Sequence, residues 1–197
     1  MSAPNPVRAA LEEAAKVQAA FRADAACLAA CDAFVEAAAA TLAAGRTVFS
    51  CGNGGSMSDA MHFAEEFSGR FRKDRAALPA QAFSDPAAMT CIANDFGFDR
   101  VFSRQVEAHG RKGDLLLVLS TSGNSPNLLE AARAARGRDI AVVGLLGRGG
   151  GALRALCDVA VVVPLATTSD RIQEVHIQVV HAVIEAVERR LFPANYA

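Results

Sequence analysis

The sequence lacks several signatures that would place a 197-residue chain in a familiar functional class. Its formal net charge is only −1, so the basic surface expected of a nucleic-acid-binding protein is missing. No apolar run approaches the roughly 18 residues that a membrane span needs. Glu12, Glu13 and Lys16 stand where a secretory signal would be apolar, which argues against export. We therefore expect a cytoplasmic protein that binds neither nucleic acid nor a membrane.

Three motifs of ligand-binding proteins are also absent. The five cysteines are scattered and include no CxxC pair, so a thiolate zinc site is not indicated and reduced cytosolic thiols fit best. Segment 52–57 has methionine where a dinucleotide fingerprint needs its third glycine or alanine. No Gly-Lys-Ser/Thr sequence occurs, which excludes a P-loop. What remains is a chain with 52% hydrophobic residues, enough to bury the core of one domain spanning 1–197.

Strand-like and helix-like segments alternate along most of the chain. Strand-forming residues predict strands at 47–51, 80–84, 115–119, 140–145 and 159–163. Helical patterns separate these strands, with a loop at 94–98 and a last helix running from Thr168 or Ser169 to about Leu191. The sequence therefore predicts an α/β fold with a doubly wound, five-stranded parallel sheet flanked by helices.

Two further helices are expected before the first strand. One begins at Asn5 and Pro6, and the second is capped by Asp24 and ends at Gly45. They form an N-terminal helical arm at 1–45, ahead of an α/β core at 46–197. Because one layer of such a fold does not require both, they either contribute to a subunit interface or merely cover the sheet.

Two polar turns follow predicted strands where phosphate could bind. The first, 52–56, has three glycines in four positions and leads directly into a helix. The second, 120–125, carries four hydroxyl side chains around Gly123. Backbone N–H groups and hydroxyls suit phosphate oxygens without a lysine, although a single turn of this kind is often only a helix cap. Two such turns at strand ends indicate a phosphate site.

A separate set of residues suggests metal or acid–base chemistry. His62 and Glu66 are four positions apart in one predicted helix and share a face, as a zinc-binding pair or as an ordinary surface pair. Gln173 and His181 lie ~12 Å apart along the last helix, so they straddle one ion or serve different subunits. His176 lies on another face and is expected to be structural or exposed. A carboxylate beside an imidazole is what aldose–ketose isomerisation needs.

In combination these motifs resemble one family. Segments 51–56, 62–66, 94–97, 120–125 and 171–174, with Asp59 and His181, are similar to bacterial phosphoheptose isomerases of the sugar-isomerase (SIS) fold. The resemblance extends from about Leu11 to Phe192. It implies a flavodoxin-like fold and conversion of sedoheptulose 7-phosphate to D-glycero-D-manno-heptose 7-phosphate, the first step toward nucleotide-activated heptose for lipopolysaccharide and other surface polysaccharide. It also implies a cytoplasmic, zinc-dependent homotetramer with one Zn²⁺ per subunit and sites at subunit interfaces.

The resemblance further implies a role for each matching residue. Glu66 would be the catalytic base and His181 its acid–base partner, while Arg70 and Asp170 would have supporting roles. The implied metal ligands are His62, Glu66, Gln173 and His181. The implied phosphate ligands are Ser120, Thr121, Ser122 and Ser125. The implied ligands of the sugar are Asn53, Gly54, Gly55, Ser56, Asn94, Asp95 and Gln173.

Two relatives of that family provide the alternative functions. The SIS-fold protein that binds the bacterial replication initiator is expected to lack the carboxylate and the histidine of the last helix, since binding needs neither. Arabinose 5-phosphate isomerases usually carry regulatory domains, for which 197 residues leave no room. The presence of Glu66 and His181 favours the heptose isomerase.

Overall fold

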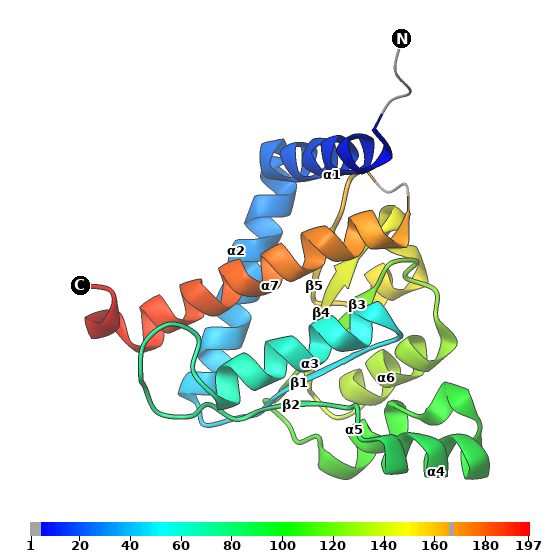
Figure 1. Ribbon diagram of the computed structural model, residues 1–197. Helices are drawn as coiled ribbons and strands as arrows, with labels where there is room; N and C mark the ends of the chain where they lie inside the picture. The colour runs from blue at the N-terminus through cyan, green and yellow to red at the C-terminus, as the bar shows by residue number, and fades with distance from the viewer. Residues whose placement is uncertain (1–4, 166–167) are drawn as a thin grey trace.

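The computed structural model describes residues 5–165 and 168–197, and one five-stranded sheet lies at its centre (Figure 1). The strands are β1 (Val48–Gly52), β2 (Ala80–Ala82), β3 (Leu115–Ser120), β4 (Ala141–Leu146) and β5 (Val159–Val162). Their order is β2-β1-β3-β4-β5, and every neighbouring pair is parallel. The predicted doubly wound parallel sheet is therefore confirmed.

Helices cover both faces of this sheet. The helices of the described residues are α1 (Pro6–Ala23), α2 (Ala25–Ala43), α3 (Gly55–Ser68), α4 (Pro86–Phe96), α5 (Ser103–His109), α6 (Pro126–Arg136) and α7 (Ser169–Leu191), with short 3-10 segments η1 (Phe98–Arg100), η2 (Arg148–Leu156) and η3 (Pro193–Asn195). Of these, α1 packs on α2 and α7 and not on the sheet. On one face α2, α3 and α7 pack over the sheet through residues such as Phe34, Phe63 and Val180. On the other face α5 and α6 pack through Val106 and Leu128.

The two N-terminal helices begin and end where the sequence predicts. Asn5 Oδ1 accepts the backbone N–H of Val7 at the start of α1, and Asp24 Oδ1 accepts that of Ala26 at the start of α2. Gly45, with φ +66°, follows the end of α2. These side-chain bonds satisfy N–H groups that have no partner inside the first turn of a helix.

The apolar character of α2 differs from expectation. Its 19 residues, with a mean hydropathy of 1.6, make it long and apolar enough, by length and composition alone, to cross a membrane. The prediction that no stretch approaches that length is therefore wrong. Alanine explains the difference, because it scores as apolar while also favouring helix. In this fold α2 packs against α7 and β5, as the core helix of a globular domain does.

The predicted loop at 94–98 is also wrong at its start. Helix α4 continues through Phe96, so Asn94 and Asp95 lie in its last turn. Asparagine and aspartate favour turns because their side chains compete for backbone hydrogen bonds, which made the loop the natural interpretation. The helix instead ends at Gly97, whose φ of +87° suits only glycine readily.

The order of the strands switches direction between β1 and β3. Gly52 at the end of β1 pairs in register with Leu119 near the end of β3. Consequently the two turns that follow, 53–56 and 121–125, lie side by side at the carboxyl edge of the sheet. An open α/β sheet binds its ligands in the crevice at this position.

Candidate active site

A pocket of about 290 Å³ occupies the crevice between the two turns. It brings together most of the residues expected to bind a sugar phosphate: Asn53, Gly54, Gly55, Ser56, Ser120, Thr121, Ser125 and Gln173. Ser122 belongs to the same turn but does not line the pocket, and its hydroxyl instead accepts the backbone N–H of Asn124 over 3.2 Å. The two turns and the start of α7 thus form one polar cavity from three separate parts of the chain.

The first turn points the start of a helix into this pocket. Gly54 adopts φ +57°, and α3 begins at the next residue. A Cβ atom at Gly52 would lie 2.5 Å from the Ser56 carbonyl oxygen, so the chain closes tightly here. The positive end of the α3 dipole therefore faces the pocket, which favours an anion.

The second turn is held in shape by a glycine-rich segment that sequence reasoning left without a role. A Cβ atom at Gly123 would lie 1.9 Å from the Gly150 carbonyl oxygen, so only glycine permits this contact between the turn and η2. Asn124 Oδ1 accepts the N–H of Ala152 over 2.9 Å. Inside the turn, the buried Ser120 hydroxyl accepts the N–H of Gly123 over 3.0 Å. These bonds fix the positions of the hydroxyl groups before any ligand arrives.

Three further polar side chains at the pocket were missed from the sequence. Ser169 was considered only as a helix cap, yet it lines the pocket and its hydroxyl lies 3.1 Å from that of Thr121. Arg148 Nη2 donates to the Ser169 hydroxyl over 3.5 Å, bringing a positive charge to the rim. Asn53 and Asn127 exchange reciprocal amide hydrogen bonds of 3.0 and 2.8 Å. The one feature of the sequence that could have identified any of these residues was the hydroxyl of Ser169 at the start of α7.

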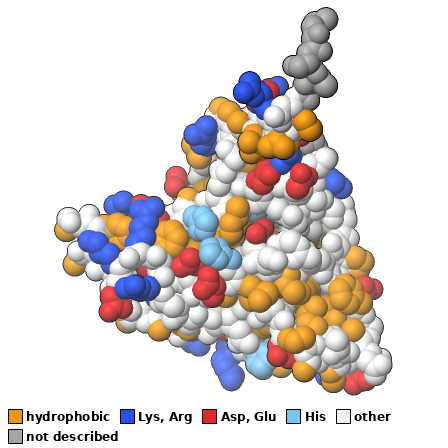
Figure 2. All heavy atoms as spheres, in the orientation of Figure 1, with side chains coloured by type: hydrophobic (Ala, Val, Ile, Leu, Met, Phe, Trp, Pro, Cys, Tyr) orange, Lys and Arg blue, Asp and Glu red, His pale blue; other side chains and the backbone are white. Residues whose placement is uncertain are grey.

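Beyond the pocket, α3 and α7 run side by side in the same direction across one face of the sheet (Figure 1). At their starts Gln173 Nε2 donates to Ser56 Oγ over 3.4 Å. Further along, the Nε2 atoms of His62 and His181 lie 2.9 Å apart. Figure 2 shows adjacent histidine side chains beside acidic ones in this region. The two predicted histidines therefore meet within a single chain.

Acidic and aromatic side chains surround this histidine pair. Glu66 Oε1 lies 3.5 Å from His62 Nε2, on the side where His181 also lies. Glu65 Oε1 lies 3.0 Å from the opposite ring nitrogen, His62 Nδ1, and so orients the imidazole. The Phe71 ring stacks on that of His181 with their centroids 5.9 Å apart. The three predicted groups with metal or acid–base roles here, His62, Glu66 and His181, thus share one cluster.

Donor atoms around His62 are spaced as zinc ligands are. Those of His62, Glu65 and Glu66 lie within 4.8 Å of one another, and the His181 ring lies against that of His62. Zinc binds imidazole nitrogen and carboxylate oxygen tetrahedrally at about 2.0–2.2 Å, which puts neighbouring donor atoms about 3.3 Å apart. The distances from His62 Nε2 to His181 Nε2 and to Glu66 Oε1, 2.9 and 3.5 Å, lie on either side of that value. Gln173 is the fourth predicted ligand, and its amide donates a hydrogen bond to the hydroxyl of Ser56 at the pocket. Its role as a ligand stays a prediction.

Asp59 of α3 and His176 of α7 also have strongly shifted pKa values. Burial raises the pKa of Asp59, one turn before His62, to about 6, and the charge of His62 offsets this only in part. Burial lowers the pKa of His176 to about 4, and the Leu146 backbone offsets this only in part. His176 is 1% exposed, so of the two roles expected for it the structural one holds.

Asn94 and Asp95 lie outside this pocket. Both are exposed in the last turn of α4, where Asn94 Nδ2 donates to Asp95 Oδ1 over 2.8 Å. Asp95 Oδ2 also accepts from the Cys91 thiol over 3.7 Å. Within one chain, the structure therefore does not join these two residues to the other predicted ligands of the sugar.

Comparison with known proteins gives a consistent result. A model of the SIS domain matches residues 9–147. A phosphoheptose isomerase of Fusobacterium nucleatum is 54% identical over 152 residues, 77% of this chain and 78% of the relative. That of Edwardsiella ictaluri is 48% identical over 185 residues, 94% of this chain and 96% of the relative.

Solved structures agree with the sequence relatives. The structure of a phosphoheptose isomerase from Francisella tularensis superposes with a TM-score of 0.90 at 31% identity, covering 96% of this chain and all of that one. The phosphoheptose isomerase from Neisseria gonorrhoeae gives a TM-score of 0.86 at 39% identity, covering 92% of this chain and 96% of that one. The chain therefore belongs to the SIS domain family and, within it, to the phosphoheptose isomerases.

Proposed function

We propose that this enzyme converts sedoheptulose 7-phosphate to D-glycero-D-manno-heptose 7-phosphate in the cytoplasm, at the start of nucleotide-activated heptose synthesis. The observation that carries the proposal is the meeting of His62, Glu66 and His181 on the same helix pair that begins at the pocket. A phosphate site alone would suit a binding protein. A carboxylate and two imidazoles beside it supply what proton transfer requires.

The spacing of these groups matches an extended sugar phosphate. Ser56 at the pocket and His62 are six residues apart on α3, about 9 Å along the helix axis. Glu66 is one further turn along, and its side chain tilts back toward the start of the helix. A phosphate held by the turns at 53–56 and 120–125 leaves the other end of an open-chain seven-carbon sugar near the histidine cluster.

Two proton movements complete the reaction. Glu66 removes a proton from C1 of the ketose. The electron pair of the C–H bond forms the C1–C2 double bond, and the π pair of the C2 carbonyl moves onto its oxygen, which gives an enediolate. Glu66 then returns the proton to C2. His181 transfers a proton from the oxygen on C1 to the oxygen on C2, so C1 becomes the aldehyde and C2 the alcohol. Each group ends in its starting protonation state, and atoms and charge balance.

His62, Glu66 and His181, with Gln173, would hold one Zn²⁺ per subunit. When bound there, the ion polarises the substrate carbonyl and so makes the neighbouring proton easier to remove. Glu65 keeps Nε2 of His62 available as a ligand by accepting a hydrogen bond at Nδ1. This arrangement is the usual one for a histidine that binds zinc in an enzyme.

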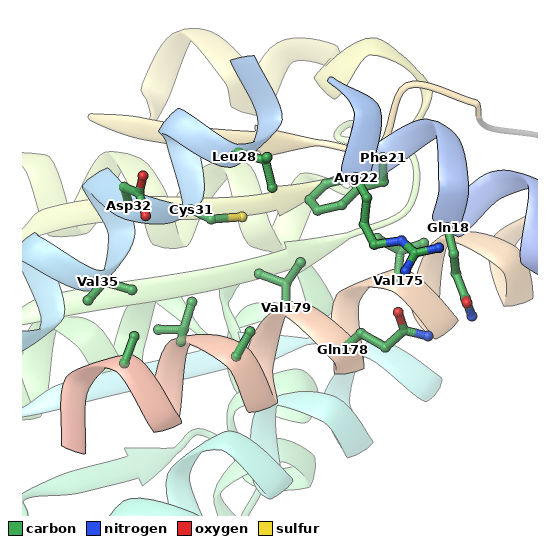
Figure 3. A pocket seen from close by; sticks show the side chains of 13 residues that line it. Gln18, Phe21, Arg22, Leu28, Cys31, Asp32, Val35, Val175, Gln178 and Val179 are labelled. Carbon is green, nitrogen blue, oxygen red and sulfur yellow. The ribbon is translucent and has the colours of Figure 1, made fainter. Parts of the chain in front are cut away.

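A homotetramer would complete the site. An apolar groove of about 450 Å³ lies between α1, α2 and α7, and Phe21, Val35 and Val179 are among the residues that line it (Figure 3). Leu28 in this groove is 45% exposed, and Val7 and Leu11 on α1 are each 66% exposed. Packing of these faces between subunits would bury them, as apolar patches on a cytoplasmic enzyme require. Of the two roles expected for the N-terminal helices, we favour the subunit interface.

Asn94 and Asp95 fit the same oligomeric arrangement. They are exposed and outside the pocket of their own chain, so a role in sugar binding would be played at a neighbouring subunit's site. Asn94 as an amide and Asp95 as a carboxylate both suit sugar hydroxyls.

The direct test is to incubate the purified protein with sedoheptulose 7-phosphate and to follow the aldose product by NMR. Arabinose 5-phosphate serves as the comparison, because five carbons should not span pocket and histidine cluster. We expect rapid conversion of the seven-carbon ketose alone. Binding of the sugar phosphate without any conversion would favour the alternative, a SIS-fold protein that binds the replication initiator.

A further inference from the structure

The connection between α3 and β2, residues 69–79, contains a buried ion pair. Arg75 Nε donates to Glu188 Oε1 of α7 over 2.7 Å, and each side chain exposes only 1% of its surface. Burying two charges is costly unless both are paired and their remaining polar atoms are bonded. A buried ion pair between a connecting segment and a helix therefore indicates that the position of one relative to the other is tightly fixed.

The remaining donors of Arg75 bind the end of the helix that carries Glu66. Arg75 Nη2 donates to the backbone carbonyl of Glu66 over 2.7 Å. Arg75 Nη1 donates to the carbonyls of Phe67 and Gly69 over 2.7 and 2.9 Å. The last carbonyls of a helix have no partner within it. One guanidinium thus caps the end of α3 at the turn from which the Glu66 side chain projects.

Glu188 is held from its other side as well. Its Oε2 accepts the hydroxyl of Tyr196 over 2.7 Å. Burial and the Glu188 carboxylate raise the pKa of Tyr196 to about 12, so this hydroxyl stays a donor at neutral pH. Asn195 Nδ2 donates to the Asp74 carbonyl over 3.1 Å, which joins the chain end to the same connection. Both charges of the pair therefore have fixed partners.

Besides the partly exposed ion pair Arg72–Glu185, three polar contacts join α3 and the connection that follows it to α7. They are Ser56–Gln173, His62–His181 and Arg75–Glu188. The first contact closes the pocket, and the second forms the histidine cluster. The third is the buried ion pair, and its connection also carries Phe71 against the His181 ring. The ion pair thus fixes how far α3 and α7 slide or separate at the histidine cluster.

We propose that Arg75 and Glu188 are positioning residues, which hold His62 and Glu66 of α3 in register with His181 of α7. This inference rests on the proposed function, because that function needs the three groups on one substrate carbon or one ion. A displacement of about 1 Å is enough to cost about 100-fold in such a reaction. Neither positioning residue touches the cluster itself, so both act through the backbone and through Phe71.

The test uses the full chain with Glu188→Gln, which keeps the shape of the side chain and removes its charge. Its partner variant Arg75→Lys keeps the charge but loses the donors to the carbonyls of α3. We expect zinc affinity, measured with Zn²⁺ alone against a competing chelator, to fall 10–100-fold, as when the partner of a metal ligand is removed. The kcat should fall about as much, while KM changes little because the pocket lies at the other end of the helix pair.

A buried substitution on the opposite face of the sheet, Val142→Ala, is the matched control. It should lower the melting temperature while leaving zinc affinity and kcat unchanged. A folded Glu188→Gln variant with the zinc affinity and kcat of the unmodified chain would overturn the inference. If Glu188→Gln does not fold, Tyr196→Phe takes its place, and we expect a smaller loss of zinc affinity in this variant. An unchanged zinc affinity in Tyr196→Phe would then overturn the proposal. Zinc affinity can be measured without turnover. If the unmodified chain does not convert the sugar phosphate, that result would therefore count against the proposed function and not against the positioning role.

Discussion

The Nε2 atoms of His62 and His181 lie 2.9 Å apart, although 119 positions separate the two residues in the chain. Their meeting follows from the parallel sheet. Helices α3 and α7 both start at the carboxyl edge of that sheet and cover the same face, so they run side by side in one direction. The fold thereby places Glu66 and two imidazoles on the helix pair that begins at the two polar turns.

Glu65 is predicted to act on the metal through His62. Glu65→Gln weakens the hydrogen bond at Nδ1 and lets the ring turn, so zinc affinity should fall 10–100-fold. Glu107→Gln, which removes a carboxylate from an ion pair on the opposite face of the sheet, is the control. Chelator competition gives both affinities. Equal affinity in the two variants would show that Glu65 is only a surface charge.

Gly123 is predicted to be intolerant of any side chain. Gly123→Ala puts a Cβ atom against the Gly150 backbone, which cannot move aside as a flexible side chain would. Gly149→Ala shares the positive φ but meets no atom within 4 Å, so it should cost only about 1–2 kcal/mol of backbone strain. Thermal unfolding and KM should both show the larger loss for Gly123→Ala. Equal effects of the two variants would mean that contact with η2 is unimportant.

Arg148 is predicted to bind the substrate phosphate from the rim of the pocket. Losing one charged hydrogen bond costs about 1.5–3 kcal/mol, so Arg148→Ala should raise KM about tenfold or more with kcat nearly unchanged. Stability should change little, because Arg148 is exposed and alanine meets the same backbone strain at φ +49°. Arg154→Ala, an exposed neighbour in η2, is the control. A KM equal to that of the control would remove Arg148 from the phosphate site.

His176 is predicted to make the protein less stable in mild acid. Its pKa is about 4 in the fold and 6.5 as the ordinary value, so the unfolded chain binds the proton more readily. Its contribution to stability is therefore present above pH 6.5 and is lost as the pH falls toward 4, by about 1.4 kcal/mol per pH unit at most. His176→Leu should flatten this part of the pH profile. Exposed His109→Asn should leave it unchanged, and a steep profile in His176→Leu would contradict the assignment.

Assembly is predicted to depend on the groove between α1, α2 and α7. Leu28→Lys places a charge in this groove and should convert the proposed tetramer to smaller species, as measured by light scattering. Leu165→Lys changes a residue of similar exposure elsewhere and should leave the mass unchanged. A stable tetramer in Leu28→Lys would mean that the groove is not an interface.

Local patterns were sufficient for most of the architecture. Apolar runs defined the strands, and Asn5, Asp24 and Gly45 marked helix boundaries through side-chain bonds or positive φ. The two polar turns came together as expected, because parallel strands that are neighbours must end at one edge. The extent of α4 was mistaken because its last turn is built from Asn94 and Asp95, residues that serve loops equally well.

Contacts between distant segments could not be read in the same way. Nothing in the sequence near Arg75 indicates that it pairs with Glu188, which is 113 positions away, or that Phe71 stacks on His181. The sequence identified Ser169 as a hydroxyl residue at the start of a helix, but it did not show which residues this hydroxyl lies beside. These features depend on how α3 and α7 pack, which periodicity alone does not specify.

The central claim is that Glu66 moves a proton between two carbons of a phosphorylated ketose. The measurement is exchange of the C1 proton of sedoheptulose 7-phosphate with D₂O, compared between the unmodified chain and Glu66→Gln. We predict rapid exchange in the former and a rate at least ~100-fold lower in the latter, with the sugar phosphate still bound. Undiminished exchange in Glu66→Gln would contradict the account.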